Sequence, residues 1–427
     1  MSRDLIAVAA NEIEASLEPG SVSSSLAALA QIGGEAEGGV TRVAWSPELF
    51  DAYAWAGERM RALGLEVAID PAGNLIGRWR VGSEDSPVVL IGSHLDTVPS
   101  GGHFDGALGV VAAIHAVALL KEEGFEPSRP LWIAAFMDEE GTRFNAALFG
   151  SRAFTGEDVT WLGERVDADG ESLRAAMAAA GFDLGRAGAA HHVGDVGAYL
   201  ELHIEQGPVL EADEIEIGVV TSIVGLRGFR VRLTGEANHA GTTPMRLRRD
   251  ALAGAARIAL ELRDVALARE AVTANVGKLT VEPGGANVVP GVADFTIDVR
   301  APTAAGLKEL ERVVDETVTR IAAEEGLVAK LEQTFALEPL ELDPELVEVV
   351  ERAALAEGAS AMRMPSGAGH DAMLVGRRAP AAMIFVPSRG GVSHSPEEYS
   401  SPEHVELGTR VLAGALRRVL SEERGIG

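Results

Sequence analysis

The stretch GSHLDTVPSGGHFDG, residues 92–106, decides how we interpret the rest of the chain. The apolar run before it is typical of a buried strand, which would deliver His94 and Asp96 to the edge of an α/β sheet where ligands bind. Alternation along an extended chain places these two side chains on one face. After a Pro- and Gly-rich loop, Asp105 precedes an apolar segment that we interpret as a buried helix. Three polar side chains therefore converge, as in half of a metal site.

Each of these three residues also has an ordinary structural interpretation. Asp105 could simply cap the helix that follows it, which is the usual role of an Asp before an apolar helix. His94 could be a core histidine, with Asp96 as its hydrogen-bond partner. These interpretations are the more common ones for single residues, and only the further motifs below favour the metal site.

Composition limits the classes of partner and ligand. With 64 acidic and 37 basic residues the formal charge is −27, which repels phosphate backbones and anionic lipids, so we expect neither a nucleic-acid nor a membrane partner. The absence of cysteine excludes disulfides and thiolate ligands, so a metal would have to be held by His, Asp and Glu. These features fit a cytoplasmic protein.

The amino-terminal region carries no clear functional signal. Residues 1–20 contain acidic side chains and no continuous apolar core, so we expect an amphipathic helix and not a signal peptide. Residues 21–45 are rich in Ser, Gly and Ala with little pattern, and we expect a loop-rich segment there. The longest apolar stretch, 106–120, is interrupted by His115 and is too short to span a bilayer.

A chain of 427 residues is too long for one core, so we expect more than one domain. Strand and helix patterns predict an α/β catalytic domain made of residues 1–214 and 334–427. The intervening segment, 215–333, is expected to be an inserted domain. Its elements follow the order of a ferredoxin-like split βαβ module: strand 215–234, helix 248–265, strands 271–281 and 292–300, helix 304–325 and strand 328–333.

Two more strands lead into polar side chains. The apolar run 131–137 is followed by adjacent carboxylates, Glu139 and Glu140, which would point to opposite sides, so that one could bind a metal while the other acts on water. A solvated acidic turn is the alternative. In the strand that begins near residue 199, His203 alternates with apolar residues and shares a face with two carboxylates.

Seven strings, taken together, resemble the hydantoinase/carbamoylase group of dimetal amidohydrolases. This group includes N-carbamoyl-L-amino-acid hydrolases, allantoate amidohydrolases and β-ureidopropionases, and is related to aminoacylases and metal carboxypeptidases. The resemblance runs from about residue 40 to the end, and the N-carbamoyl-L-amino-acid hydrolases look most similar. The strings are HLDT (94–97), GGHFDG (101–106), EEGTRF (139–144), HIEQG (203–207), NHAGTTPM (238–245), SGAGHDAM (366–373) and SHSP (393–396).

The resemblance implies a ligand set for two divalent ions per subunit. Asp105 would bridge the ions, His94 and His203 would complete one site, and Glu140 and His394 would complete the other. Nitrogen and oxygen ligands of this kind suit Zn²⁺, Mn²⁺ or Co²⁺ better than calcium. The fold that it implies is a dimetal peptidase-like α/β domain with an inserted dimerisation and lid domain.

The resemblance also implies catalytic and substrate-binding roles. Asp96 would accept a hydrogen bond from the far nitrogen of His94, Glu139 would be the general base and then the acid, and His239 would stabilise the oxyanion. A planar guanidinium would anchor the substrate carboxylate. The implied substrate contacts are Gln206, His239, Asn287, Arg300 and Gly369.

We therefore expect a homodimeric enzyme that removes the N-carbamoyl (ureido) group from small N-carbamoyl-L-amino acids, giving the L-amino acid, carbon dioxide and ammonia. Allantoate amidohydrolase and β-ureidopropionase activities are the alternatives, and an aminoacylase or dipeptidase is a more distant one. A metal-binding module without catalysis would lack a ligand or the general base, and this chain has both.

Overall fold

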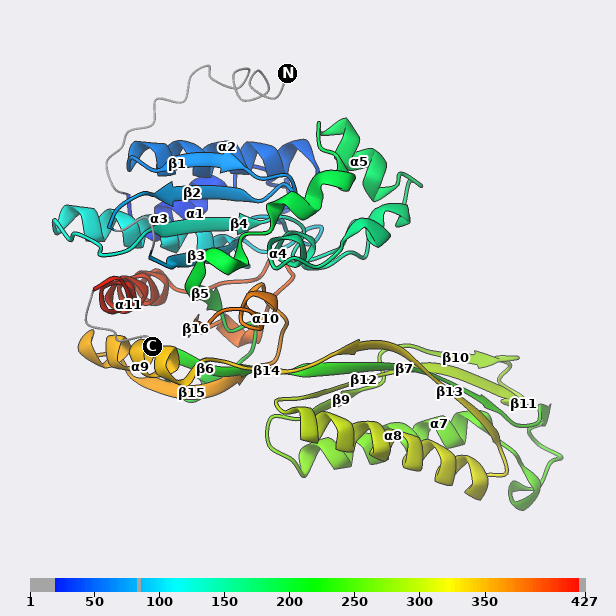
Figure 1. The fold of residues 1–427 in the computed structure, drawn as a ribbon. Coiled ribbons are helices and arrows are strands. Elements are labelled where there is room, and N and C mark those ends of the chain that lie inside the picture. The colour runs from blue at the N-terminus through cyan, green and yellow to red at the C-terminus, as the bar shows by residue number, and fades with distance from the viewer. Residues whose placement is uncertain (1–19, 83–85, 422–427) are drawn as a thin grey trace. The chain divides into compact units, whose positions relative to one another are not determined.

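The computed structural model describes residues 20–82 and 86–421, and contacts divide the chain into two compact units (Figure 1). The first unit comprises Met1–Thr221, Leu342–Met364 and His370–Gly427. The second unit comprises Ser222–Glu341 and Pro365–Gly369. The second unit therefore begins and ends several residues later than the range 215–333 expected from the sequence. It also includes the short segment Pro365–Gly369, which is rich in glycine.

A nine-stranded sheet has the order β1-β2-β4-β3-β5-β16-β6-β14, and β15 pairs with β6. Its strands lie in the first unit, except that β14 and the ends of β6 and β15 fall within the residues of the second unit. Strands β4, β3, β5 and β16 run parallel, as in the α/β sheet expected around residues 92–106. The strands are β1 (Glu66–Ile69), β2 (Leu75–Trp79), β3 (Val88–His94), β4 (Leu131–Phe136), β5 (Val196–Ile204), β6 (Ile217–Ile223), β14 (Leu340–Glu341), β15 (Ala361–Ser366) and β16 (Ala381–Val386).

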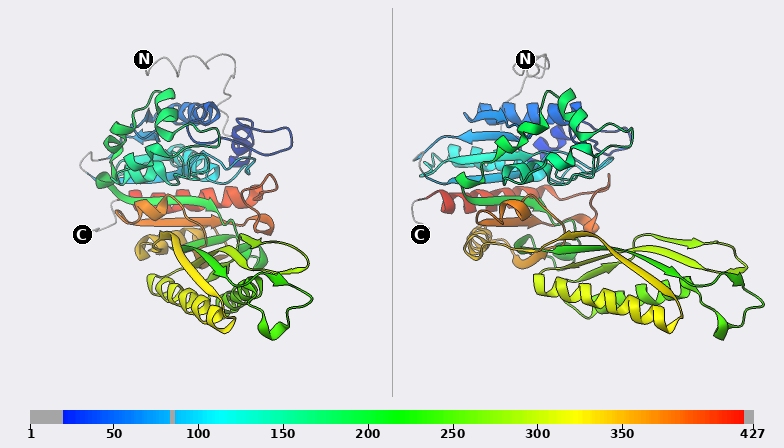
Figure 2. Two further views of the ribbon diagram at one scale, coloured as in Figure 1. Left: turned by 90° about the vertical axis from the view of Figure 1, so that its right-hand side faces the viewer. Right: turned by 45° about the vertical axis from the view of Figure 1, so that its right-hand side comes forward.

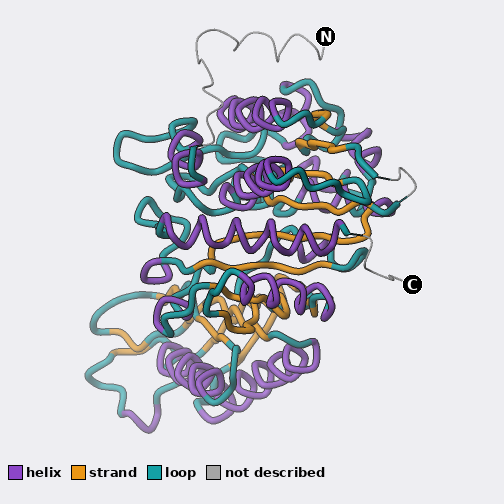
Figure 3. The backbone as a smooth tube through the Cα atoms, turned by 90° about the vertical axis from the view of Figure 1, so that its left-hand side faces the viewer, coloured by secondary structure: helices purple, strands orange, loops and turns teal. Residues whose placement is uncertain are grey.

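Helices pack on this sheet through apolar side chains, and helices and strands alternate along much of the chain (Figure 3). The helix that follows residues 92–106, α3, is buried along most of its length because it contacts β3, β4, β5 and the last helix, α11. Burial on several sides explains its almost uninterrupted apolar sequence. The helices are α1 (Val22–Leu29), α2 (Pro47–Ala62), α3 (Ala107–Glu122), α4 (Phe149–Phe154), α5 (Leu173–Ala179), α6 (Val209–Ala212), α9 (Pro344–Ala356), α10 (Ala372–Val375) and α11 (Pro402–Leu420).

The second unit has a five-stranded antiparallel sheet with the order β10-β12-β7-β13, and β9 pairs with β12. Its helices α7 and α8 cover one face of this sheet (Figure 2), and their apolar sides share one core with the strands. The chain order β7-α7-β10-β12-α8-β13 is that of a split βαβ module. The elements are β7 (Gly225–Thr234), β8 (Asn238–His239), α7 (Ala251–Leu267), β9 (Thr273–Asn275), β10 (Leu279–Glu282), β11 (Val288–Val289), β12 (Val292–Ala301), α8 (Ala304–Glu324) and β13 (Val328–Leu337).

Within the loop-rich segment 21–45 the structure forms one helix, α1, whose first turn is capped by Ser21 accepting a hydrogen bond from the amide of Ser24. The alternative role of Asp105 as a helix cap is not observed, since the capping position of α3 is Gly106 and no side chain caps this helix. The amphipathic helix expected over residues 1–20 falls almost entirely outside the described residues. In the part of the chain that the structure describes, no helix is long and apolar enough to cross a membrane.

We predict that Gly92→Ala strongly destabilises the first unit. Gly92 has φ 140°, and a Cβ atom there would lie 1.9 Å from the Ala134 carbonyl oxygen of the neighbouring strand β4. Backbone strain and overpacking together should lower the free energy of unfolding by about 2 to 4 kcal/mol. Urea denaturation of the metal-stripped protein measures this loss. Gly188→Ala is the control, because a Cβ atom there meets nothing within 4 Å; equal stability of the two variants would contradict the prediction.

Candidate metal centre and active site

The carboxylate of Asp105 lies at the centre of the candidate site. Its Oδ1 atom is 3.1 Å from His203 Nε2 and 3.6 Å from His94 Nε2. Its Oδ2 atom is 3.2 Å from His394 Nε2, which in turn is 3.5 Å from a carboxylate oxygen of Glu140. One carboxylate therefore faces two groups of potential ligands, one through each oxygen.

The two groups differ in their exposure to solvent. In each group the ligand atoms lie within 4.8 Å of one another. All three residues of the first group, His94, Asp105 and His203, are buried. In the second group the side chain of His394 is 50% exposed, and Glu140 is partly buried. The second group therefore faces the side from which a small molecule can approach.

Sheet topology explains why ligands far apart in the sequence meet. His94 is the last residue of β3, and His203 is the penultimate residue of β5. Glu140 follows β4, and His394 lies in the loop after β16. Since these four strands are parallel, their carboxyl ends lie along the same edge of the sheet, where ligands bind in α/β folds.

Backbone carbonyl groups orient the two buried histidines. His94 Nδ1 lies 3.0 Å from the main-chain oxygen of Asp96, and His203 Nδ1 lies 2.9 Å from that of Ile204. A proton on each Nδ1 leaves Nε2 free to face Asp105 as a ligand. The contact expected between His94 and Asp96 is therefore made by the main-chain oxygen of Asp96, because its carboxylate lies farther away, at 3.7 Å.

The Asp96 carboxylate binds the backbone of the turn that follows β4. Its two oxygens accept hydrogen bonds from the backbone amides of Glu139, at 3.3 Å, and Glu140, at 3.1 Å. Asp96 therefore fixes the turn after β4 from which both glutamates project. The Glu139 carboxylate lies 3.7 Å from His94 Nε2, and the Glu140 carboxylate lies 3.5 Å from His394 Nε2. The two adjacent side chains therefore contact different ligand groups.

The closely spaced charges at the centre shift the pKa values of the histidines and of the carboxylates. Burial raises the pKa of Asp105, but hydrogen bonds from three histidines outweigh burial and hold this pKa well below its usual value. Burial lowers the pKa of His94, but the negative charges of Glu139 and Asp105 raise it well above its usual value. The hydrogen bond with Asp105 raises the pKa of His394 to about 9. Burial raises the pKa of Glu140 to about 7 and that of Glu139 well above its usual value.

This donor set fits divalent metal ions. Three imidazoles and buried carboxylates converge on Asp105, and in this arrangement positive charge is needed to keep the carboxylates ionised. A cation in each group supplies the positive charge that protonated histidines otherwise provide. The ligand atoms are nitrogen and oxygen only, which suits borderline and hard divalent ions.

Gln206, expected to contact substrate, lies against the metal centre. Its Nε2 atom donates to Asp105 Oδ2 at 2.7 Å and is 3.4 Å from Ser393 Oγ. Its Oε1 atom is buried and accepts no hydrogen bond among the described residues. Gln206 therefore touches the second ligand group directly.

His239 and Asn287 lie together in the second unit. Strands β8 and β11 pair, and the Asn287 carbonyl accepts a hydrogen bond from the amide of Ala240. His239 Nδ1 accepts from the amides of Gly241, at 3.0 Å, and Thr242, at 3.2 Å. Since Nδ1 is an acceptor, the proton of a neutral ring is on Nε2, which makes this exposed side chain a hydrogen-bond donor.

Arg300 and the segment before Gly369 also meet within the second unit. Arg300 Nε donates to Asp298 at 3.0 Å, and Nη1 donates to the Gly367 carbonyl oxygen at 2.8 Å. Two partners fix the guanidinium plane while leaving further N–H groups for an anion. Gly369 itself has open space where a side chain would begin.

Comparison with known proteins identifies the family. Residues 90–418 match the model of peptidase family M20/M25/M40. The chain belongs to this family. It is 42% identical over 386 residues to the N-carbamoyl-L-amino-acid amidohydrolase of Paenarthrobacter aurescens, covering 90% of this chain and 94% of that protein. It is also 42% identical over 397 residues to the allantoate amidohydrolase of Bacillus subtilis, covering 92% and 95%.

Solved structures agree with this family membership. The crystal structure of a hydantoinase/carbamoylase family amidase from Burkholderia multivorans matches with a TM-score of 0.88 and 37% identity over 94% of this chain and 97% of that chain. The expected resemblance to the hydantoinase/carbamoylase group is therefore confirmed. This M20 protein is an amidohydrolase that acts on C–N bonds, and its family and ligand clusters support the use of divalent metal.

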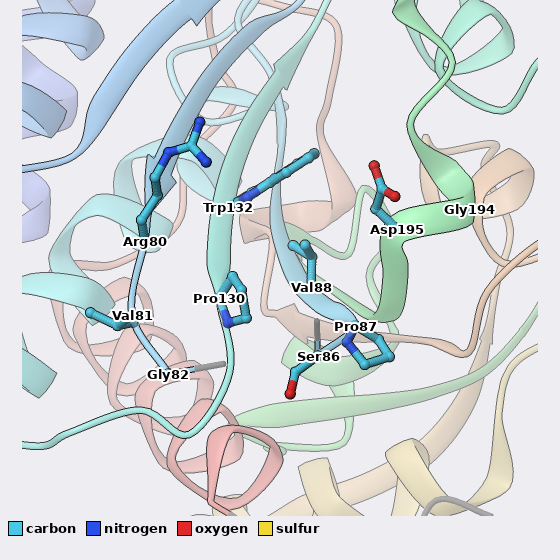
Figure 4. Close-up of a pocket in the computed structure, with 10 residues that line it drawn as sticks. All are labelled: Arg80, Val81, Gly82, Ser86, Pro87, Val88, Pro130, Trp132, Gly194 and Asp195. Carbon is cyan, nitrogen blue, oxygen red and sulfur yellow. The ribbon is translucent and has the colours of Figure 1, made fainter. Parts of the chain in front are cut away.

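Figure 4 shows a pocket in the M20 amidohydrolase that none of the site residues lines. It has a volume of about 450 Å³ and is lined by residues that include Arg80, Val88, Pro130, Trp132 and Asp195. These residues flank the amino ends of β3, β4 and β5. The metal centre lies at the carboxyl ends of the same strands, so this pocket is not part of it.

Glu398 is the buried site residue to which the sequence pattern assigned no role. It contacts the loop of Asp105 and the loop of His394, and burial together with the charge of Asp105 raises its pKa. The pair Glu397-Glu398 looks like a solvated acidic turn in the sequence. Only its position four residues after His394 could have drawn attention to it.

We predict that the M20 amidohydrolase loses its activity when metal is removed. Chelation by dipicolinate should abolish turnover, and added Zn²⁺, Mn²⁺ or Co²⁺ should restore it. His94→Ala removes a ligand and should lower metal affinity by more than the ~10- to 100-fold typical of an outer partner. Elemental analysis after dialysis measures the retained metal. Full activity in a metal-free sample would contradict the prediction.

We predict that Glu139→Gln keeps the metal and loses most of the turnover. The change removes a group that can carry a proton but leaves the five proposed ligands in place, so kcat should fall by at least about 100-fold. Metal analysis and steady-state kinetics of the same sample test this. Loss of metal instead of turnover would show that Glu139 and Glu140 have exchanged roles.

Proposed function

We propose that this protein hydrolyses the N-carbamoyl group of N-carbamoyl-L-amino acids, giving the L-amino acid, carbon dioxide and ammonia. The observation that carries the proposal is the Asp105 carboxylate, which is shared between two ligand groups beside Glu139, whose side chain is 11% exposed. The 42% identity to a carbamoylase supports the ureido substrate class. The carboxylate-binding role proposed for Arg300 supports an amino-acid product.

We further propose that two divalent ions, Zn²⁺, Mn²⁺ or Co²⁺, occupy the two groups. Asp105 would be shared, His94 and His203 would hold one ion, and Glu140 and His394 would hold the other. Such ions supply Lewis acidity to the carbonyl oxygen and lower the pKa of water. The residues described next supply the remaining chemistry.

In this mechanism Glu139 moves the proton. Its burial raises its pKa toward the range in which a carboxylate is an effective base near neutral pH. Glu139 accepts a proton from the attacking water and then donates it to the leaving nitrogen as the C–N bond breaks. The carbamate left by hydrolysis decomposes to carbon dioxide and ammonia, so atoms and charge balance without an oxidant or a reductant.

Residues of the second unit are proposed to bind the substrate. His239 would donate from Nε2 to the carbonyl oxygen as negative charge develops on it, which is where such a donor has the largest effect. Arg300 would hold the substrate carboxylate, with Asn287, Gln206 and Gly369 as further contacts. The exposure of His239 and the oriented guanidinium of Arg300 support these roles.

Allantoate amidohydrolase activity is the second candidate. The Bacillus subtilis allantoate amidohydrolase is as similar to this chain, at 42% identity, as the carbamoylase is. Allantoate also carries a carboxylate beside ureido groups, so the same anchor and the same proton carrier would serve it.

We also propose a cytoplasmic homodimer formed through the second unit. Strand β13 pairs with β7 only, among the described residues, and most of its side chains are exposed. Val328 and Phe335 on this strand are 72% and 51% exposed. An exposed sheet edge with apolar side chains is a suitable surface for pairing with a second copy. The sequence without cysteine fits a reducing compartment.

One substrate panel tests the proposed function. Ammonia release would be measured with N-carbamoyl-L-amino acids, their D-enantiomers, allantoate and N-carbamoyl-β-alanine, after loading with each metal ion. The proposal expects the highest kcat/KM with an N-carbamoyl-L-amino acid. A higher value for allantoate would establish the second candidate, and release from none of these compounds would refute both.

We predict that Arg300→Ala lowers kcat/KM by roughly 30- to 1000-fold, which corresponds to about 2 to 4 kcal/mol, because a charged hydrogen bond to the substrate carboxylate is lost. Arg300→Lys should lose less, since it keeps the charge but not the planar guanidinium. Steady-state kinetics with the native substrate and with its neutral amide analogue measure the effect. In the Arg300→Ala variant, replacing the substrate by its neutral amide analogue should lower kcat/KM little further.

Arg230→Ala is the matched control for Arg300. Arg230 also pairs with an aspartate on β12, through two hydrogen bonds to Asp294, but the Arg230 side chain is 59% exposed and no substrate role is proposed for it. Its kinetics should be unchanged. Additive losses for Arg300→Ala and the amide analogue would show that Arg300 does not touch the carboxylate.

A further inference from the structure

Glu398 connects the two loops that carry Asp105 and His394. Its side chain is buried, with the residue only 4% exposed. Its Oε1 atom accepts hydrogen bonds from the backbone amides of Phe104, at 2.9 Å, and Asp105, at 3.0 Å. Its Oε2 atom accepts a hydrogen bond from Ser393 Oγ at 2.8 Å. A single carboxylate therefore holds segments that are nearly 300 residues apart in sequence.

Ser393 links Glu398 to the metal centre itself. Its hydroxyl lies 3.1 Å from Asp105 Oδ2 as well as 2.8 Å from Glu398 Oε2. A hydroxyl has one proton, so the two carboxylates compete for it. When Asp105 Oδ2 binds a cation, the Ser393 proton can remain with Glu398, and the hydroxyl then orients the backbone immediately before His394.

The surrounding residues are shaped to accept this carboxylate. A Cβ atom at Gly102 would lie 2.1 Å from Glu398 Oε1, so a side chain at this position would displace Glu398. Next to Glu398, the ring of Tyr399 packs edge-on against Phe104, with centroids 5.9 Å apart, and the Arg389 guanidinium lies 4.3 Å from the Tyr399 ring centroid. The two loops are therefore in contact on both sides of Glu398.

We propose that Glu398 is a positioning residue that assembles the second ligand group before metal binds. By tying the amide of Asp105 to the loop of His394, it holds Asp105 Oδ2 and His394 Nε2 at their separation of 3.2 Å. A buried negative charge beside Asp105 is unfavourable in itself, which argues for a role beyond packing. Outer partners of this kind orient ligands and raise metal affinity. The inference rests on the proposed dimetal centre, but not on the identity of the substrate.

Metal titration of the full chain tests this proposal. The metal-stripped Glu398→Ala variant would be titrated with Co²⁺, and binding would be followed by visible absorption and by metal analysis after dialysis. We expect the affinity for the second equivalent to fall by ~10- to 100-fold, as for other outer partners, with a changed cobalt spectrum. Since no substrate is present, the outcome is independent of the panel that tests the proposed function.

Asp70 provides a matched control. It is 6% exposed, its Oδ1 atom accepts the amides of Ala72, at 2.8 Å, and Asn74, at 3.0 Å, and its Oδ2 atom accepts the Asn74 side chain at 2.8 Å. This is the hydrogen-bonding pattern of Glu398, located in the turn between β1 and β2. Asp70→Ala should lower stability but leave Co²⁺ affinity and the cobalt spectrum unchanged.

Two results would overturn the proposal. One is unchanged Co²⁺ affinity in folded Glu398→Ala, and the other is an equal loss of affinity in Asp70→Ala, which would indicate general destabilisation. If Glu398→Ala does not fold, Glu398→Gln decides. Its carbonyl can still accept the two amides, but its NH₂ group directs the Ser393 proton to Asp105 Oδ2, where it competes with the ion. Roughly tenfold weaker binding of the second Co²⁺ is expected, and unchanged binding refutes the role.

Discussion

The carboxylate of Asp105 is the interaction on which the rest of the centre depends. Each of its oxygens faces a different group of ligands, so any shift of this one side chain disturbs both groups. The structure therefore fixes it from several directions. Gln206 and Ser393 contact Oδ2, histidines face both oxygens, and Glu398 accepts its backbone amide. The strands that lead into these residues are central and parallel, which places the carboxylate at their carboxyl ends.

Backbone strain accompanies this arrangement. Asp138, Gln206 and His394 have φ values of 57°, 57° and 56°, in a region that residues other than glycine rarely adopt. Each such residue costs of the order of 1 to 3 kcal/mol, so the surrounding packing must hold it there. All three follow a strand of the parallel set or lie in the loop beyond it. The turns that aim Glu139, Gln206 and His394 toward the centre are thus stabilised by the sheet and not by their own conformational preference.

Much of the fold could be predicted from the sequence because the relevant signals are local, whereas the proposed ligand set came from the resemblance of seven strings to a known family. His94 and Glu140 each follow an apolar run, and such runs reliably indicate buried strands. The acceptor chosen by His94 could not be predicted, because the carbonyl and the carboxylate of Asp96 are both within reach and only the chain geometry distinguishes them. Glu398 was missed for a different reason. Its contact with Asp105 joins positions 293 residues apart, and no local pattern records such a contact.

The discontinuous first unit has a consequence for the order in which the chain is made. Strand β5 pairs on one side with β3, but its other neighbour, β16, is followed by the loop of His394 near the end of the chain. During translation the segment of the second unit is therefore synthesised while one edge of β5 is still unpaired. Exposed strand edges can pair with other chains, so aggregation is favoured during this interval. Slow or interrupted translation beyond residue 204 is therefore expected to lower the yield of soluble protein, while the protein that does fold keeps its activity.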